Sequence, residues 1–299
     1  MKYTRLNSDA AITILLDWLD SNFEQFKPLP SEGLNSFTHI KPLGELALIL
    51  FAFKAPSFHS ENKRLIQWIQ VTSERLFPFV EEWGAAIDWQ RLHLLGTQSP
   101  EKVTALLIFP VVSSLVGKDS CWLPNVQDTF RKTVTSTDFL QIDLLFAKDL
   151  AIKESCLDAS ISLLLAASKK PPEIRFQTSS LYLVTHYIFF ATRMGNRPVQ
   201  LKKDQQQEVY SYLKEALEQA CVKNNYDLMA ELQMCLCQLQ FVDSVSRRTA
   251  IDKLIEVIVQ TGLLPGNHDG KVRNGTDFHE HYHACLMGLS AIGLSNREC

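Results

Sequence analysis

An all-α fold is predicted by the way apolar residues recur along the 299-residue chain. Apolar side chains return at three- and four-residue intervals, which is the spacing of one face of a helix. Helix start and stop signals separate these runs, as at Ser99-Pro100-Glu101, where a cap, a first-turn proline and an acid stand together. No convincing alternation of apolar and polar residues, typical of a half-buried strand, interrupts them. The pattern indicates about a dozen helices joined mostly by short loops.

Caps and prolines set the expected helix boundaries in the first part of the chain. Ser8 is the expected N-cap of the first helix, because Ile12 and Leu15 follow it at helical spacing. Pro42 is expected to begin a helix and Pro78 to end one, since proline lacks the N–H that a helix interior needs. The helices expected here cover 8–23, 42–51, 60–77, 83–95, 99–111, 123–130, 137–146 and 155–167.

The last third of the chain carries clearer boundary signals. Thr178-Ser179 precedes a very apolar run that Gly195 closes, and glycine is common just beyond a helix end. Asp277 follows a glycine-rich loop and is expected to cap the final helix. The helices expected here cover 181–194, 208–222, 227–241, 244–259 and 278–294, and the loop covers 263–276.

Many helices joined by short connections predict stacked antiparallel hairpins. Two architectures satisfy this pattern, an open α-solenoid and an α/α toroid with a central cavity. Solenoid repeats normally have a fixed period, and no such period is legible in this sequence. We therefore expect one toroid-like domain over residues 1–299, with the site-bearing half at about 177–299.

Composition argues against several classes of function. The formal net charge is -3, so the chain has no basic field for nucleic acid or anionic lipid. The most apolar stretch, 43–53, contains Glu45 and is about half the length that a membrane span needs. An odd number of irregularly spaced cysteines is not a disulfide framework. We expect a cytoplasmic protein that binds a small molecule or peptide, with a protein partner as a further option.

Three histidines gather directly before the final apolar segment. On a helix, His279 and His283 share a face, while His281 and Tyr282 turn away. Two histidines at that spacing can chelate a divalent transition metal. The alternatives are one buried, hydrogen-bonded histidine among solvated ones, or a Cys/His metal site that joins His283 to one of the cysteines at 235, 237 and 285.

A second polar line lies on the helix expected after Asn225. Asp227, Glu231 and Cys235 follow one another at four-residue intervals, and apolar residues flank Glu231. Burial would raise the pKa of this carboxyl and suit it to general acid–base chemistry. The alternative is an exposed face, or an ion pair with Arg247 or Arg248 on the next helix.

His186 stands inside the apolar run 181–190. Such a histidine is commonly a core residue, here bonded by hydroxyls such as those of Thr185 or Tyr182. If the last helices line one cavity, however, His186, Glu231 and His283 converge there, since ionisable groups with perturbed pKa values cluster at functional sites.

Three blocks of this chain resemble an uncharacterised bacterial family of all-helical proteins of similar length. The blocks are the run 181–192 with Thr185-His186, the acidic run 227–232, and Tyr282-His283. Arg193-Met194-Gly195 departs from the Asp-Phe-Gly expected at that place. The resemblance implies that His186, Glu231, Tyr282 and His283 matter, without implying a reaction.

The sequence therefore leads to two hypotheses of different classes. In the first, the chain is an enzyme that uses His186, Glu231, Tyr282 and His283 in acid–base or metal-assisted chemistry, with His279 and His283 as metal ligands. In the second, it is a non-catalytic helical scaffold for a peptide or a partner enzyme.

Overall fold

The computed structural model describes residues 2–28, 37–56, 58, 60–98, 100–133, 142–241, 244–266 and 277–295. Regular secondary structure within these ranges is helical throughout, with no strand. The predicted all-α class is confirmed.

The helices follow the expected order, with several boundaries moved. The first half contains α1 (Lys2–Ser21), η1 (Phe23–Phe26), α2 (Phe37–Phe53), α3 (Lys63–Ala86), α4 (Trp89–Gln98), η3 (Pro100–Leu107), α5 (Ile108–Val116), α6 (Leu123–Lys132) and α7 (Ile142–Ile152). The second half contains α8 (Leu157–Ser168), α9 (Pro172–Arg175), α10 (Thr178–Ala191), α11 (Lys203–Lys223), α12 (Tyr226–Gln238), α13 (Ser244–Thr261) and α14 (Phe278–Ser295).

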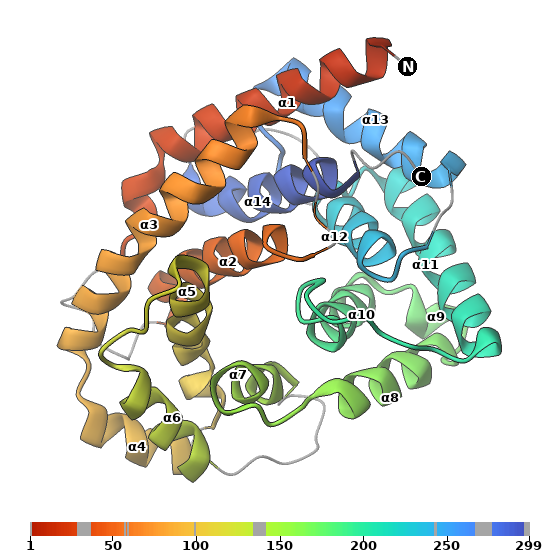
Figure 1. Cartoon of the computed structure of the whole chain (residues 1–299). Coiled ribbons are helices and arrows are strands. Elements are labelled where there is room, and N and C mark those ends of the chain that lie inside the picture. The colour runs from red at the N-terminus through yellow and green to blue at the C-terminus, as the bar shows by residue number, and fades with distance from the viewer. Residues whose placement is uncertain are drawn as a thin grey trace.

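Helices from the two ends of the chain pack together. Helix α1 contacts α13 and α14, and α14 also contacts α2 and α12. In Figure 1, α1, α3, α8, α11 and α13 lie on the outside, and α2, α5, α10, α12 and α14 lie inside them. This arrangement brings residues near the start of the chain beside the C-terminal helix. The toroid interpretation itself stays a prediction.

The inner and outer helices differ in how much of their surface is buried. Every residue from Ala284 to Leu294 in α14 is buried, as is every residue from Leu228 to Leu236 in α12. A helix that is buried on all sides belongs to the interior. The outer helix α3 instead buries one stripe, which includes Leu65, Trp68, Leu76 and Val80.

Two predicted proline boundaries are wrong. Pro78 lies inside α3, which continues to Ala86, and Pro42 lies inside α2 and not at its start. An interior proline costs about 3 kcal/mol. Buried Val80 and Trp83 continue the apolar stripe of α3 beyond Pro78, so their packing outweighs that cost. Because α3 is longer, the helix expected from position 83 begins at Trp89.

Some other boundary signals are confirmed, but Ser8, expected as an N-cap, lies inside α1, and Gln177 is the N-cap residue of α10 in place of Thr178 or Ser179. The Asp277 carboxylate accepts a hydrogen bond from the His279 backbone N–H at 3.0 Å and so caps α14. Helix α10 ends at Ala191, earlier than expected, and Gly195, with a φ of 87°, lies in the turn beyond it. The Thr137-Asp138 helix start and most of the loop 263–276 lie outside the described residues.

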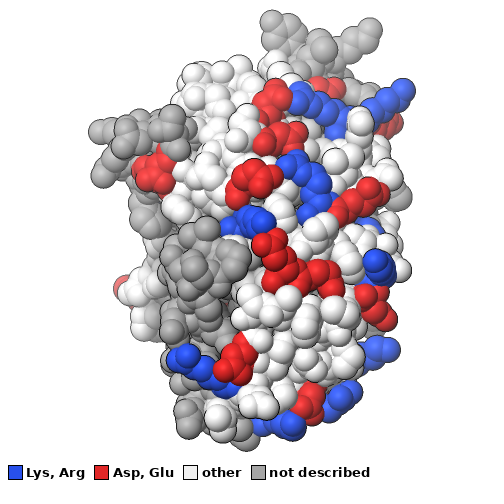
Figure 2. Space-filling view, turned by 90° about the vertical axis from the view of Figure 1, so that its left-hand side faces the viewer, with Lys and Arg blue, Asp and Glu red and all other residues white. Residues whose placement is uncertain are grey.

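Charges of both signs are mixed on the outer surface. Figure 2 shows acidic and basic side chains interspersed over one face of the molecule. Ion pairs between α1 and α3 include Arg64 with Asp17 and Arg75 with Asp20. Within the described ranges, no helix combines the length and apolar character that crossing a membrane requires.

Candidate metal centre

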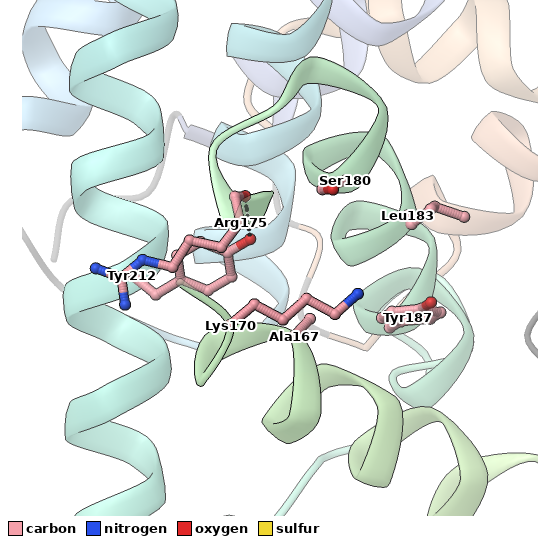
Figure 3. A pocket seen from close by; sticks show the side chains of 7 residues that line it. All are labelled: Ala167, Lys170, Arg175, Ser180, Leu183, Tyr187 and Tyr212. Atoms are coloured by element: carbon pink, nitrogen blue, oxygen red, sulfur yellow. Dashed lines mark hydrogen bonds between the residues drawn. The ribbon is translucent and has the colours of Figure 1, made fainter. Parts of the chain in front are cut away.

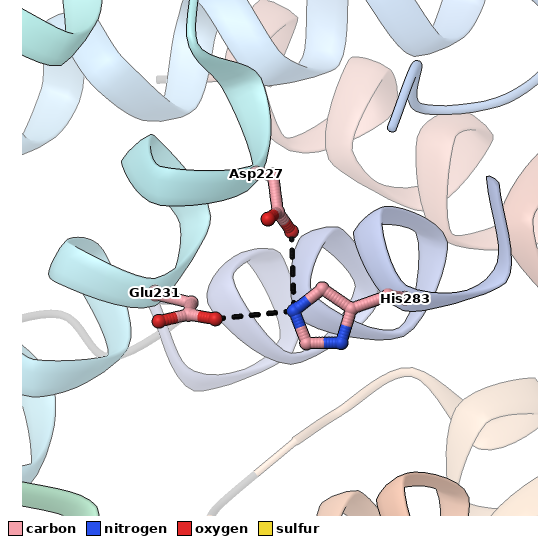
Figure 4. A group of neighbouring side chains, drawn as sticks. All are labelled: Asp227, Glu231 and His283. Atoms are coloured by element: carbon pink, nitrogen blue, oxygen red, sulfur yellow. Dashed lines mark hydrogen bonds and ion pairs between the residues drawn. The ribbon is translucent and has the colours of Figure 1, made fainter. Parts of the chain in front are cut away.

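Three carboxyl groups from α2 and α12 surround the His283 imidazole of α14. Its Nε2 lies 3.1 Å from Glu231 Oε1 and 3.4 Å from Asp227 Oδ1. Figure 4 shows both contacts as dashed lines. Its Nδ1 lies 2.9 Å from Glu45 Oε2. Both ring nitrogens therefore face carboxylates.

Local helix geometry determines these positions. The Asn225 side chain accepts a hydrogen bond from the Leu228 N–H at 3.2 Å and caps α12. Asp227 and Glu231 follow one helical turn apart, so their carboxylates share a face. Helix α14 packs against both α12 and α2, which puts His283 between that face and Glu45.

Hydroxyl groups on α10 hold the outer oxygens of the two α12 carboxylates. The Tyr182 hydroxyl donates to Asp227 Oδ2 at 2.7 Å, and the Thr185 hydroxyl donates to Glu231 Oε2. Within the described structure, Asp227 Oδ1 is buried without a hydrogen-bond partner and has only its ion-pair contact with His283. Asp227 Oδ1, Glu231 Oε1 and His283 Nε2 thus remain directed at one another.

Glu45 anchors the other side of the imidazole. Burial opposes ionisation of this carboxyl, but the His283 charge and hydrogen bond, together with Lys41 and Tyr282, lower its pKa to about 2. Lys41 Nζ lies 3.5 Å from Glu45 Oε1. Burial and the charge of Glu45 raise the pKa of Tyr282, so the phenol donates a proton in its hydrogen bond to this carboxylate.

The cluster contains more negative than positive groups. Burial opposes the imidazolium, but Glu45 and Asp227 raise the pKa of His283 well above its ordinary value. Burial, countered by His283 and reinforced by Glu231, raises the pKa of Asp227. One imidazolium therefore stands among three carboxyl groups, and such a set attracts a further cation.

The donor atoms suit a divalent transition metal. One ligand atom each from Asp227, Glu231 and His283 lies within 4.8 Å of the others. Carboxylate oxygen and imidazole nitrogen are ligands of zinc and of iron. Metal-binding histidines usually donate their second N–H to a carboxylate, which fixes the tautomer. Glu45 stands where that second carboxylate is required.

His186 lies beside this cluster without joining it. Its Nδ1 is 3.5 Å from Asp143 Oδ1, and its side chain is 42% exposed. Burial lowers the pKa of His186, but the Asp143 hydrogen bond and the charge of Glu231 raise it more. The expected bonding of His186 by Thr185 or Tyr182 is wrong, because both hydroxyls donate to the carboxylates of α12.

The neighbouring aromatic residues of α14 have different environments. His279 is exposed, packs against the Phe278 ring, and lies outside the group that converges on His283. His281 is fully buried, and its Nδ1 accepts the Gly266 N–H at 3.3 Å. Tyr282, expected to turn away, instead reaches the same Glu45 carboxylate as His283.

The two alternatives, an ion pair between Glu231 and an arginine and a Cys/His metal site, are corrected by the observed partners. Arg247 donates to the Phe241 carbonyl and to Cys237, and Glu231 pairs with His283 instead. The thiols at 235 and 285 donate to backbone carbonyls of Thr185 and Leu264, respectively. Neither thiol belongs to the group that converges on His283.

Sequence reasoning missed the roles of Glu45 and Asp143 and did not select Asp227 as a site residue. Glu45 carried a usable signal, because it is the one acid in the apolar run 43–53. Asp227 belonged to the recognised polar line on its helix. Asp143 stands at the start of α7 with no local pattern that links it to His186.

The fold and the cluster define an all-helical protein with one half-buried imidazole among three carboxyl groups. Residues 122–292, more than half of the chain, match the family model described as Domain of unknown function (DUF6895). The chain belongs to this family. The matched region includes Asp227, Glu231 and His283, and Glu45 lies before it. No curated protein and no solved structure matches the chain.

Proposed function

We propose that this chain is a metal-dependent enzyme that holds one divalent transition-metal ion between Asp227, Glu231 and His283. The observation that carries the proposal is the convergence of three ligand atoms within 4.8 Å, with a further contact behind each ligand side chain. Tyr182, Thr185 and Glu45 provide those contacts. A chance cluster of polar residues would not need a supporting contact behind each of its three side chains.

Charge balance supports a cation at this position. Glu231 is 2% exposed and Asp227 is 13% exposed as side chains, so solvent screens their repulsion poorly. Asp227 and Glu231 would neutralise their charges on a bound divalent ion, and His283 would hold that ion through a deprotonated Nε2. Glu45 meanwhile accepts the Nδ1–H and leaves Nε2 as the ligand atom.

Residues of this chain have distinct roles in the proposed chemistry. A bound ion would polarise a carbonyl group or lower the pKa of water. His186, more exposed than the ligands and paired with Asp143, would exchange a proton with the substrate at the outer side of the site. Tyr282 would hold Glu45 in place. The substrate class remains that expected from sequence, a small molecule or peptide.

The setting of the protein belongs to the same proposal. The cysteines within the described ranges are free thiols, which supports a reducing cytoplasm. The bacterial origin rests on the resemblance of the three sequence blocks. The contact between α1 and α13 supports a toroid over an open solenoid.

Metal titration tests this function with a matched pair of histidines on one helix. After chelator treatment, the wild-type protein should bind one equivalent of Zn²⁺, Mn²⁺ or Fe²⁺ in calorimetry. His283→Gln and Asp227→Asn should each weaken binding about a hundredfold or more, since each removes a ligand. His279→Gln should bind as tightly as wild type. Tight stoichiometric binding that survives both His283→Gln and Asp227→Asn would contradict the proposal.

The same titration distinguishes the metal-dependent enzyme from an enzyme that works without a metal. If no ion binds to wild-type protein, the metal centre is wrong, and the three carboxyl groups and two histidines would act by proton transfer alone. The non-catalytic scaffold would instead predict that His186→Ala and Glu231→Gln leave the biological activity unchanged.

A further inference from the structure

A cavity lies on a different face of α10 from the metal centre. It has a volume of about 60 Å³ and is formed by residues of α8, α9, α10 and α11 and by Lys170 between α8 and α9. Figure 3 shows the residues that line it: Ala167, Lys170, Arg175, Ser180, Leu183, Tyr187 and Tyr212. None of these residues belongs to the His283 cluster.

The two charged residues in the lining of this cavity are basic. Lys170 and Arg175 both contribute to it, and no lining residue is acidic. In Figure 3 the Lys170 side chain extends past Ala167 toward Tyr187. An ammonium group in such surroundings is complementary to an anionic ligand.

Arg175 is held in position by surrounding groups. Its Nη1 donates to the Ser168 carbonyl at 3.2 Å, and its Nη2 lies 3.5 Å from Glu215 Oε2. The guanidinium also stacks over the Tyr212 ring at 5.8 Å. Glu215 partly balances Arg175, so Arg175 contributes a fixed positive field beside the Lys170 ammonium.

Hydroxyl groups complete the polar part of the lining. Ser180 lies in the first turn of α10, where no acidic residue is present. The Tyr212 hydroxyl donates to the Arg175 carbonyl at 2.9 Å, which fixes that wall. Ser180 can donate its hydroxyl proton to an anion held by Lys170.

Size restricts the occupant. A dry apolar cavity of about 150 Å³ accommodates benzene, and this cavity has less than half that volume. We propose that it binds a small oxyanion, a phosphate or carboxylate group, through Lys170 and Ser180. The group is a free ion or the end of a longer molecule that extends into solvent past exposed Lys170.

Calorimetric titration of chelator-treated full-length protein tests this site. Inorganic phosphate and acetate are the two probes, and Asp227→Asn serves as a background in which the proposed metal centre is disabled. Binding of either probe should persist in that background. This separates the anion site from the metal centre, so failure of one proposal leaves the other standing.

Two neighbouring lysines provide a matched comparison. Lys170→Met should weaken anion binding about tenfold or more, because it removes a charge-assisted hydrogen bond. Lys169→Met should change it less than about twofold, because Lys169 does not line the cavity. Ser180→Ala should weaken binding by a smaller factor.

Three outcomes would overturn the anion site. They are no binding of either probe, equal weakening by Lys169→Met and Lys170→Met, and loss of binding in Asp227→Asn alone. Thermal melting of each variant checks that the fold is retained, and exposed Lys170 is expected to tolerate substitution.

Discussion

Two buried carboxylate clusters in this molecule have opposite charge balance. Asp149, whose side chain is 3% exposed, pairs with Arg193 at 3.0 Å and Arg197 at 2.8 Å. The Cys156 thiol adds a donor to the same carboxylate at 3.3 Å. Around His283, by contrast, three carboxyl groups share one imidazole and the exposed ammonium of Lys41, which lies 3.5 Å from Glu45. The first cluster has its cations built in, whereas the second lacks one.

The difference separates a structural role from a binding role. Arg197 also donates to the carbonyls of Phe190 and Ala191, so the Asp149 cluster joins the end of α10 to α7. Arg193 and Met194 have φ values of 48° and 55°, and this cluster holds that left-handed segment in place. The His283 cluster has no such complement of charge, which is typical of a site that receives a ligand.

Removal of Asp149 should produce the largest effect, a loss in the free energy of unfolding. Asp149→Ala leaves two arginines without their buried counter-ion and should lower the free energy of unfolding by about 3–5 kcal/mol. Urea unfolding followed by circular dichroism measures the loss. Asp158→Ala, an exposed acid at the start of α8, should cost less than about 1 kcal/mol. A loss at position 149 as small as that at 158 would remove the structural interpretation.

Protonation of Glu45 should produce the next largest effect in metal-free protein. Because folding lowers the pKa of Glu45 from 4.5 to about 2, its contribution is present above pH 4.5 and lost as pH falls toward 2. That contribution is on the order of 3 kcal/mol. Folding raises the pKa of His283, so its contribution is present below 6.5 and lost as pH rises through the folded-state pKa.

Urea unfolding at a series of pH values checks these signs. The pair should stabilise the metal-free fold most between pH 4.5 and 6.5. His283→Gln should flatten the acid limb, since the imidazolium is the main cause of the low Glu45 pKa. An unchanged acid limb in this variant would show that the two groups are not coupled.

The smallest effect is expected from the hydroxyl that orients Asp227. Tyr182→Phe removes the 2.7 Å hydrogen bond to Oδ2 and should weaken metal binding about tenfold, as is usual for groups behind a ligand. Tyr226→Phe, at the start of the same helix as Asp227, provides the control and should leave affinity unchanged. Equal affinities in the two variants would show that Tyr182 does not position the ligand.

Local signals predicted much of the fold. Asp277 and the apolar spacing of the last helices gave their start and identity, because caps and periodicity act within one helical turn. The helix end predicted at Pro78 was wrong, because the packing of Val80 and Trp83 is a tertiary effect that local sequence rules do not include. The contact between α1 and α13 likewise depends on the whole chain.

The site was only partly predictable for the same reason. Asp227 and Glu231 are neighbours on one helix, so their shared face could be read from spacing. His283 joins them only through packing of α14 against α12, and Glu45 joins from a position far earlier in the sequence. The predicted partner of His283, His279, was the nearest suitable residue along the helix, but proximity in sequence did not decide which groups meet.

The contact of α2 with α14 has a consequence for how this chain could be divided. Residues 122–292 carry every proposed ligand, yet Glu45 belongs to the preceding part. A shortened protein that starts at position 122 would leave His283 Nδ1 without the acceptor that selects its tautomer. Helix α2 therefore supplies one side of the site around His283, and the helices before position 122 cannot be treated as a removable extension.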